Sequence, residues 1–192
     1  MPRVGVLALQ GDVREHVARL EEIGVETSTV RTPEQLDDLD GLVLPGGEST
    51  AIAHLLTTSG IRPVLALHID EGLSVLGTCA GLILLSSKIL DGRSDQWSFA
   101  ALPVAVRRNG YGRQIASFEA NVDVKGVGEV QGVFIRAPKI EEWSDELEIL
   151  AQHDHGDGDH PVLVRHGRVW GCSFHPELTA DTRIHRLFVD SL

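Results

Sequence analysis

The apolar and polar positions in the first half of the chain predict strands that alternate with helices. Short apolar runs typical of buried strands occupy residues 3–9, 25–30, 41–44 and 73–77. Between them, apolar residues recur at helical spacing from Val13 to Leu20, from Ile52 to Leu56 and around residues 62–69. Because such alternation gives parallel sheets covered on both faces, this half predicts a doubly wound α/β fold.

The residues that flank these runs mark where the predicted elements begin and end. Gly24 is placed to stop the first helix, because glycine is common just past a helix C-terminus. Pro45-Gly46-Gly47 closes the third strand with a turn. We expect Ser49 to cap the helix that follows, since a serine hydroxyl accepts a hydrogen bond from a free N–H of the first helical turn.

The second half of the chain changes to short strand-like runs with turns rich in Gly, Asn and Asp, which is typical of antiparallel strands. These runs lie at residues 102–107, 115–124, 130–135, 161–165 and 168–174, and a closing helix is expected near residues 181–190. The sequence shows neither a repeat nor a linker. Residues 1–192 are therefore expected to form a single domain, a mostly parallel flavodoxin-like sheet with an antiparallel extension.

Charge and composition narrow the classes of function. The 192 residues carry 17 basic and 28 acidic groups, a net charge of −11, and 42% of them are hydrophobic. This acidity argues against binding a nucleic-acid backbone, which needs a basic face. No leader peptide opens the sequence, and no apolar run approaches the roughly 18 residues of a membrane span. With two cysteines, too few for a disulfide framework, we expect a soluble cytoplasmic protein without nucleic-acid or membrane partners.

One cysteine, Cys79, lies in the sequence GTCAG at residues 77–81, where a predicted strand becomes a helix. This is the thiol counterpart of the G-x-S-x-G nucleophile elbow, whose sharp turn needs minimal side chains on either side. The helix dipole favours the thiolate there, and the N–H of Ala80 can donate to an oxyanion. A structural buried cysteine is the competing interpretation, which the strand-turn-helix context disfavours. Cys172 lies within an apolar strand and is expected to pack.

A thiol nucleophile needs a base, and His175 is the best-placed histidine. It follows the apolar strand VWGCSF, at the carboxyl edge where parallel sheets gather functional residues. Glu177, two residues further on, is placed to hold the imidazole in one tautomer. On this stretch alone, a capped turn before the last helix explains the same residues equally well.

Other histidines have plainer explanations. Four fall on predicted helices, where surface or packed-core roles suffice: His16, His54, His68 and His185. Three more belong to the sequence HDHGDGDH: His153, His155 and His160. The spacing of these three matches neither a zinc motif nor an EF-hand loop. We interpret this stretch as a solvated turn and expect no metal.

Several motifs together resemble a known family. LPGGEST (44–50), GTCAG (77–81) and HPEL (175–178), in this order, look like those of triad-type class I glutamine amidotransferases. More narrowly, LALQGDVREH, RRNGYGRQIASFE, VFIRAP and GCSFHPELT resemble the glutaminase subunits of pyridoxal 5′-phosphate synthases. The resemblance spans nearly the whole chain, from Val4 to the final helix.

The resemblance implies hydrolysis of L-glutamine to glutamate and ammonia through a thioester. In this reading Cys79 attacks the side-chain amide, His175 transfers the protons and Glu177 orients His175. The N–H groups of Gly47 and Ala80 would hold the oxyanion.

The same resemblance assigns the residues that bind the amino-acid end of glutamine: Gly47, Glu48, Ser49, Arg108, Ile135 and Arg136. Arginine suits a carboxylate because its fork donates two parallel hydrogen bonds. Arg108 is preferred to its neighbour Arg107 because it directly precedes Asn109, as in the family pattern.

The resemblance further implies a partner, a barrel-shaped synthase subunit that uses the ammonia to make pyridoxal 5′-phosphate, with no metal or bound cofactor in this chain. Gln10, at the end of the first strand, is placed to reach either the active site or the docking face, and is a candidate for coupling the two. Three alternatives remain open. They are an ammonia-donating subunit for histidine, aminobenzoate or purine synthesis, a stand-alone cysteine hydrolase or stress protein, and a non-catalytic doubly wound binding domain.

Overall fold

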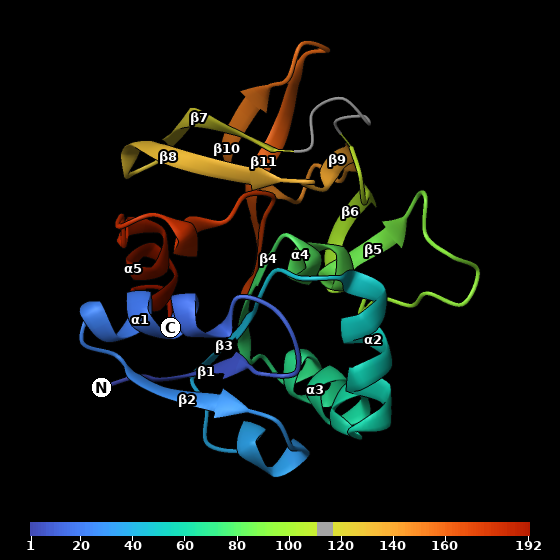
Figure 1. The fold of residues 1–192 in the computed structure, drawn as a ribbon, viewed down its shortest axis with the longest axis vertical. Helices are drawn as coiled ribbons and strands as arrows, with labels where there is room; N and C mark the ends of the chain where they lie inside the picture. Colours follow the sequence, from blue (N-terminus) through green and yellow to red (C-terminus); the bar gives the residue numbers. More distant parts are fainter. Residues whose placement is uncertain (111–116) are drawn as a thin grey trace.

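The computed structural model describes residues 1–110 and 117–192, and it has a central sheet with helices on both faces (Figure 1). The GRQ sequence at residues 112–114 and the first two residues of the strand expected at 115–124 lie outside the described residues. In the part that is described, no helix is long and apolar enough to cross a membrane.

Five parallel strands form the body of a seven-stranded sheet, in the order β10-β11-β12-β4-β3-β1-β2. The parallel strands are β1 (Arg3–Leu7), β2 (Glu26–Val30), β3 (Gly41–Leu44), β4 (Ser74–Thr78) and β12 (Val169–Cys172). The antiparallel strands β10 (Glu148–Asp154) and β11 (Asp159–His166) form one edge. Since β2 and β3 flank β1 on opposite sides, the winding reverses there, and such switch points bind ligands at the carboxyl ends of the strands.

Helices cover both faces of this sheet, as the sequence pattern predicts (Figure 1). One face carries α1 (Val13–Glu22) and α5 (Arg183–Val189), and the other carries α2 (Ser49–Thr58), α3 (Ile61–Asp70) and α4 (Ala80–Leu85). Successive side chains of a strand point to opposite faces. In β3, Leu42 and Leu44 therefore join the core on the α2–α4 side, whereas Val43 joins the core on the α1 and α5 side.

Two smaller sheets extend the molecule beyond the carboxyl ends of the parallel strands (Figure 1). The first contains β5 (Ser86–Ile89), β6 (Leu102–Arg107) and β9 (Lys139–Trp143), and the second is the hairpin of β7 (Ser117–Val124) and β8 (Gly128–Ile135). The backbone N–H of His175 donates to the carbonyl of Val133 in β8 at 2.8 Å. This hydrogen bond fixes the hairpin against the segment that follows β12. Short 3₁₀ turns lie at Pro33–Leu36 and Pro176–Leu178.

The α/β fold and the alternation of strands and helices are confirmed, but three strands escaped the sequence pattern. They are β5, β9 and β10, with the sequences SSKI, KIEEW and EILAQHD. Each is short or mixed in polarity, so neither an apolar run nor a clean alternation marks it. The run at 168–174, which we grouped with the antiparallel extension, contains β12, and this strand lies parallel to β4.

The expected cap of α2 is wrong by one residue. Ser49 is the first residue of the helix, and Glu48 is the cap. The carboxylate of Glu48 accepts hydrogen bonds from the backbone N–H groups of Thr50 at 3.1 Å and Ala51 at 2.7 Å. A carboxylate at a helix N-terminus gains from the dipole as well as from hydrogen bonds, which is the reason it takes the place of the serine.

Candidate active site

The carboxyl ends of the parallel strands open into a cavity of about 460 Å³. Four of the five parallel strands lead into it: Gln10 and Asp12 follow β1, Gly47 and Glu48 follow β3, Cys79 follows β4 and His175 follows β12. Arg108, Ile135 and Arg136 line it from the smaller sheets. The sheet thus brings together residues that lie far apart in the sequence.

Cys79 occupies a strained turn between β4 and α4. Its backbone has φ +49° and ψ −103°, a conformation rare for a residue with a side chain. A Cβ on Gly77 would lie 2.5 Å from the carbonyl carbon of Gly81, and a Cβ on Gly81 would overlap the carbonyl oxygen of Leu44. Both flanking positions therefore require glycine, for the steric reason that the GTCAG pattern suggests.

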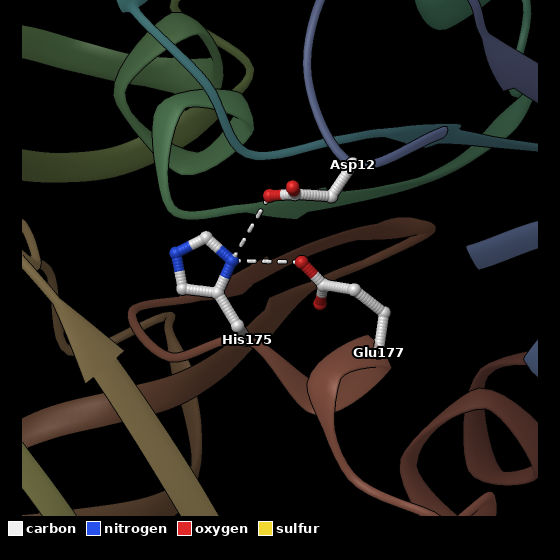
Figure 2. Close-up of side chains that lie close together, drawn as sticks. All are labelled: Asp12, His175 and Glu177. Carbon is white, nitrogen blue, oxygen red and sulfur yellow. Dashed lines mark hydrogen bonds and ion pairs between the residues drawn. The ribbon is translucent and has the colours of Figure 1, made fainter. Parts of the chain in front are cut away.

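Two carboxylates face the same ring nitrogen of His175 (Figure 2). Nδ1 lies 2.7 Å from Oε1 of Glu177 and 3.5 Å from Oδ2 of Asp12. Glu177 is buried, whereas Asp12 is about one third exposed. Since a carboxylate only accepts hydrogen bonds, Nδ1 must carry the proton, which leaves Nε2 to exchange protons on the side of the cavity.

The electrostatics of this pair favour a charged imidazole. Burial lowers the pKa of His175, but interactions with Cys79 and Glu177 outweigh it and raise the pKa to about 10. Burial raises the pKa of Glu177, and the hydrogen bond from His175 opposes that rise. A protonated His175 next to the Cys79 thiol is the arrangement that stabilises a thiolate.

The loop after β3 is held by a side chain from the loop after β1. The N–H of Glu48 donates to Oε1 of Gln10 at 3.0 Å. Gly47 has φ +150°, and a Cβ there would lie 2.5 Å from the same oxygen. The positive φ strains any residue with a side chain, so this point favours glycine, and Gln10 is in contact with the loop that borders the cavity.

The neighbouring residues Arg107 and Arg108 have different partners in the structure. Arg108 lines the cavity and donates from one guanidinium nitrogen to Thr50 Oγ1 at 3.2 Å and to Gln96 Oε1 at 3.1 Å. Arg107 instead forms a two-point ion pair with Glu141, at 2.7 and 3.1 Å. Of these two neighbours, Arg108 is therefore the one that can reach a ligand in the cavity.

The remaining residues named from the sequence also lie at or beside the cavity. Ser49 lines it, and its hydroxyl accepts a hydrogen bond from Gln96 at 3.0 Å. Ile135 and Arg136 lie at the end of β8, and Arg136 has the unusual φ of +41°. Ala80 directly follows Cys79 as the first residue of α4. Cys172 is fully buried in β12, as expected.

Sequence reasoning missed the histidine pair His16 and His185. Both are fully buried, and Nδ1 of His16 lies 2.9 Å from Nε2 of His185. On its other side, Nε2 of His16 lies 3.4 Å from Oε2 of Glu177. The sequence pattern placed His16 on a helix but could not identify its partners, because nothing local indicates that this helix packs against the turn after β12.

The HDHGDGDH stretch is only partly a solvated turn. Its tip is exposed, but His153 and His155 pack with the aromatic rings of Phe118 and Phe134. The turn joins β10 to β11, and the hairpin of β7 and β8 lies against it. The two histidines therefore help to fasten the hairpin to the edge of the main sheet.

One group of metal-type ligands appears among the described residues: Asp12, His175 and Glu177, whose donor atoms lie within 4.8 Å of one another. Nδ1 of His175 is the shared atom, and it is already held by Glu177. A cation there would displace the proton that orients the ring, so the group fits a hydrogen-bonded histidine better than a metal centre.

Comparison with known proteins identifies the family. A model of the SNO glutamine amidotransferase family matches residues 6–192. The chain belongs to this family. A relative from Streptomyces avermitilis, named pyridoxal 5′-phosphate synthase subunit PdxT, is 53% identical over 191 residues, covering 98% of this chain and 93% of its own. A PdxT relative from Mycobacteroides abscessus is 51% identical over 190 residues, with 98% and 96% covered.

Solved structures agree with this assignment. A crystal structure described as a glutamine amidotransferase matches with a TM-score of 0.92 and 46% identity, covering 98% of this chain and 97% of that one. The structure of PurLQS from Thermotoga maritima matches with a TM-score of 0.69 at 18% identity, covering 98% of each chain. At that identity the second match shows a common fold alone.

Proposed function

We propose that this chain is the glutaminase subunit of a pyridoxal 5′-phosphate synthase, and that it hydrolyses L-glutamine to L-glutamate and ammonia. The main support for this reaction is the geometry of the site. Cys79 occupies a strained turn and lines the same cavity as His175, and Nδ1 of His175 lies 2.7 Å from Oε1 of Glu177. Relatives named PdxT, 53% and 51% identical, favour this branch over ammonia donors of other pathways.

In the proposed mechanism Cys79 and His175 start as a thiolate and an imidazolium. The sulfur attacks the side-chain amide carbon of glutamine, and Nε2 of His175 protonates the departing ammonia. His175 then takes a proton from water, which attacks the thioester and releases glutamate. Glu177 keeps Nδ1 protonated and stabilises the imidazolium through both steps.

We assign the oxyanion to the backbone N–H groups of Ala80 and Gly47. The N–H of Ala80 lies at the start of α4, where the helix dipole favours negative charge. The Pro-Gly-Gly turn allows the peptide at Gly47 to present either its N–H or a carbonyl, because glycine accepts both conformations. Two backbone donors aimed at a developing negative charge are worth several kcal/mol of barrier, about 3 kcal/mol for each.

We place the amino-acid end of glutamine between the 47–49 loop and the smaller sheets. Arg108 supports this assignment, because its guanidinium lines the cavity and its partners there, Thr50 and Gln96, are neutral. The carboxylate of Asp91 lies 4.0 Å from Nε of Arg108, and no two-point hydrogen-bonded pair joins the two side chains, so the guanidinium fork can still bind a ligand carboxylate. Glu48, Ile135 and Arg136 line the same cavity and complete the proposed binding site.

We also propose that the chain works with a synthase subunit that receives the ammonia. Gln10 contacts the loop that carries Gly47, so a partner docked beside Gln10 would act directly on the proposed oxyanion hole. Cys79 and His175 come from opposite halves of the chain, which supports one glutaminase domain over residues 1–192. The two free cysteines are consistent with the cytoplasm as its compartment.

The deciding experiment measures glutamate release from glutamine by the isolated chain and by the chain with saturating synthase subunit. We expect a low rate alone and roughly a hundredfold higher rate in the complex, because a single oxyanion donor is worth about that factor. The Cys79→Ala variant serves as the background control in both assays. Equal rates with and without the synthase would reject the coupling and favour a stand-alone hydrolase.

A further inference from the structure

We infer that His16 is a positioning residue, which holds Glu177 from the side opposite His175 and keeps its carboxylate ionised. This inference rests on the proposed function of His175 and Glu177 but adds a residue that lies on a different element, α1. Figure 2 shows the second carboxylate oxygen of Glu177, Oε2, pointing away from the ring of His175.

Oε2 of Glu177 needs a partner that the triad does not supply. It is buried and accepts no hydrogen bond from the residues that the structure describes. Nε2 of His16 lies 3.4 Å from it, and the side chains of both residues are fully buried. A buried carboxylate without a donor tends to take up a proton, because burial penalises the charged form. An N–H of His16 next to Oε2 opposes this loss of charge.

The surrounding contacts fix which nitrogen of His16 carries the proton. A carboxylate can only accept, so the favourable tautomer of His16 has its proton on Nε2, which lies 3.1 Å from Thr78 Oγ1 and faces Oε2 of Glu177 at 3.4 Å. Nδ1 of His16 must then accept, and the Nε2–H of His185 donates to it at 2.9 Å. A line of buried polar contacts therefore runs from His185 in α5 through His16 in α1 to Glu177.

Burial, more than any neighbouring charge, keeps the ring of His16 neutral. Burial lowers the pKa of His16 well below its usual value, and the neighbouring His185 and His175 lower it further. Burial and the nearby Arg19 also lower the pKa of His185, to about 4. A neutral ring with one fixed N–H can stabilise a carboxylate without competing with His175 for its negative charge.

The contact with Thr78 adds a second link to the site. Thr78 is the last residue of β4 and directly precedes Cys79. His16 thus contacts the strand that carries the nucleophile and the carboxylate that orients the base.

Two substitutions of His16 distinguish its contact with Glu177 from its contact with His185. In His16→Gln the amide nitrogen reaches about as far as Nε2, so an N–H remains near Glu177. In His16→Asn the shorter amide matches Nδ1, so contact with His185 remains and contact with Glu177 is lost. Both variants keep a neutral amide at this buried position, which makes each the control for the other. Leu20→Ala, buried elsewhere on α1, is the control for lost stability.

The measurement is the pH dependence of Cys79 alkylation by iodoacetamide on the full chain, which does not require turnover. The fully buried Cys172 does not compete for the reagent. In His16→Asn we expect the acid limb of the profile to move up by about one pH unit, because Glu177 keeps its proton and supports the imidazolium less. His16→Gln and Leu20→Ala should keep the wild-type limb.

Glutamate release by the complex with the synthase subunit is measured in parallel, where we expect a lower kcat and an unchanged KM for His16→Asn alone. Identical profiles for His16→Asn and His16→Gln would overturn the inference about His16. A Cys79→Ala variant as active as wild type would instead overturn the proposed function. If neither His16 variant folds, the same alkylation profiles are compared for His185→Gln and His185→Leu. Only leucine removes the donor to Nδ1 of His16, so only His185→Leu should shift the acid limb.

Discussion

His175 has two carboxylates at one ring nitrogen, and they differ in distance and burial. Glu177 is buried at 2.7 Å, whereas Asp12 is partly exposed at 3.5 Å. A charge in contact with solvent is screened, so Asp12 contributes less to the pKa of His175 than Glu177 does. At the scale of single residues, the proposed mechanism therefore predicts unequal effects for equal substitutions.

The nucleophile gives the first prediction at this scale. Cys79→Ala should abolish glutamate release while the fold persists, because alanine fits the strained turn at least as well as cysteine. Loss of the nucleophile of a triad typically costs several orders of magnitude in rate. Circular dichroism and thermal unfolding check the fold, and a steady-state assay checks the rate. Near-normal turnover by a folded Cys79→Ala chain would rule out the assignment.

The base and its two carboxylates give the second prediction. His175→Asn should be nearly as damaging as Cys79→Ala, because one imidazole serves both proton transfers. Glu177→Gln should reduce kcat by about tenfold to a thousandfold, since the amide still accepts from Nδ1 but carries no charge. Asp12→Asn makes the same chemical change at the exposed site, and we expect no more than a few-fold loss. A lower kcat for Asp12→Asn than for Glu177→Gln would reverse the assignment of the orienting residue.

At the scale of elements, α4 lies very close to the end of β3. Gly81 lies in α4, and a Cβ there would overlap the carbonyl oxygen of Leu44. At an open helix position, Gly→Ala stabilises a protein by roughly 0.5–1 kcal/mol. Gly81→Ala should do the opposite, lowering the free energy of unfolding by about 1–3 kcal/mol and reducing turnover, because α4 and Cys79 must shift.

A glycine in open space is the control for this element-scale prediction. A Cβ on Gly126 would meet no atom within 4 Å, and only its φ of +78° opposes a side chain. Gly126→Ala should cost about 1 kcal/mol of stability and leave turnover unchanged. Denaturant unfolding and glutamate release measure both variants. Equal turnover in the two would show that α4 and β3 are less tightly fitted than the structure indicates.

The whole molecule contains several histidines that burial keeps neutral. The pKa of His185 is lowered to about 4, that of His16 is also well below 6.5, and that of the half-buried His155 is about 4. A histidine whose pKa is lowered by folding contributes stability that is complete above about pH 6.5 and is lost as the pH falls toward 4.

We therefore expect the free energy of unfolding to fall between pH 6.5 and 5, before most carboxylates titrate. Each fully buried neutral histidine lowers the free energy of unfolding by roughly 1 kcal/mol for each pH unit of acidification. His155 contributes less, because it is partly exposed and solvent screens its charge. Urea unfolding at several pH values measures the slope. The His185→Leu variant, which removes one titrating ring, should show a smaller slope. A flat stability over this range would contradict the prediction.

Much of the fold and of the site follows from local patterns in the sequence. The apolar runs at residues 41–44 and 102–107 coincide with β3 and β6 because each is a continuous buried strand. The GTCAG sequence predicted the strained turn at Cys79 because only glycines leave room around it. HPEL placed Glu177 near His175 because residues two positions apart in the chain cannot lie far apart in space. These features depend on neighbours in the chain, which a sequence displays.

Only the tertiary structure decided the features that join distant segments. The contacts of His16 with Glu177 and His185 arise from the packing of α1 against the turn after β12 and against α5. The second carboxylate on His175, Asp12, comes from the loop after β1. Such contacts depend on how elements pack in three dimensions, and the spacing of residues along one chain does not encode that packing locally.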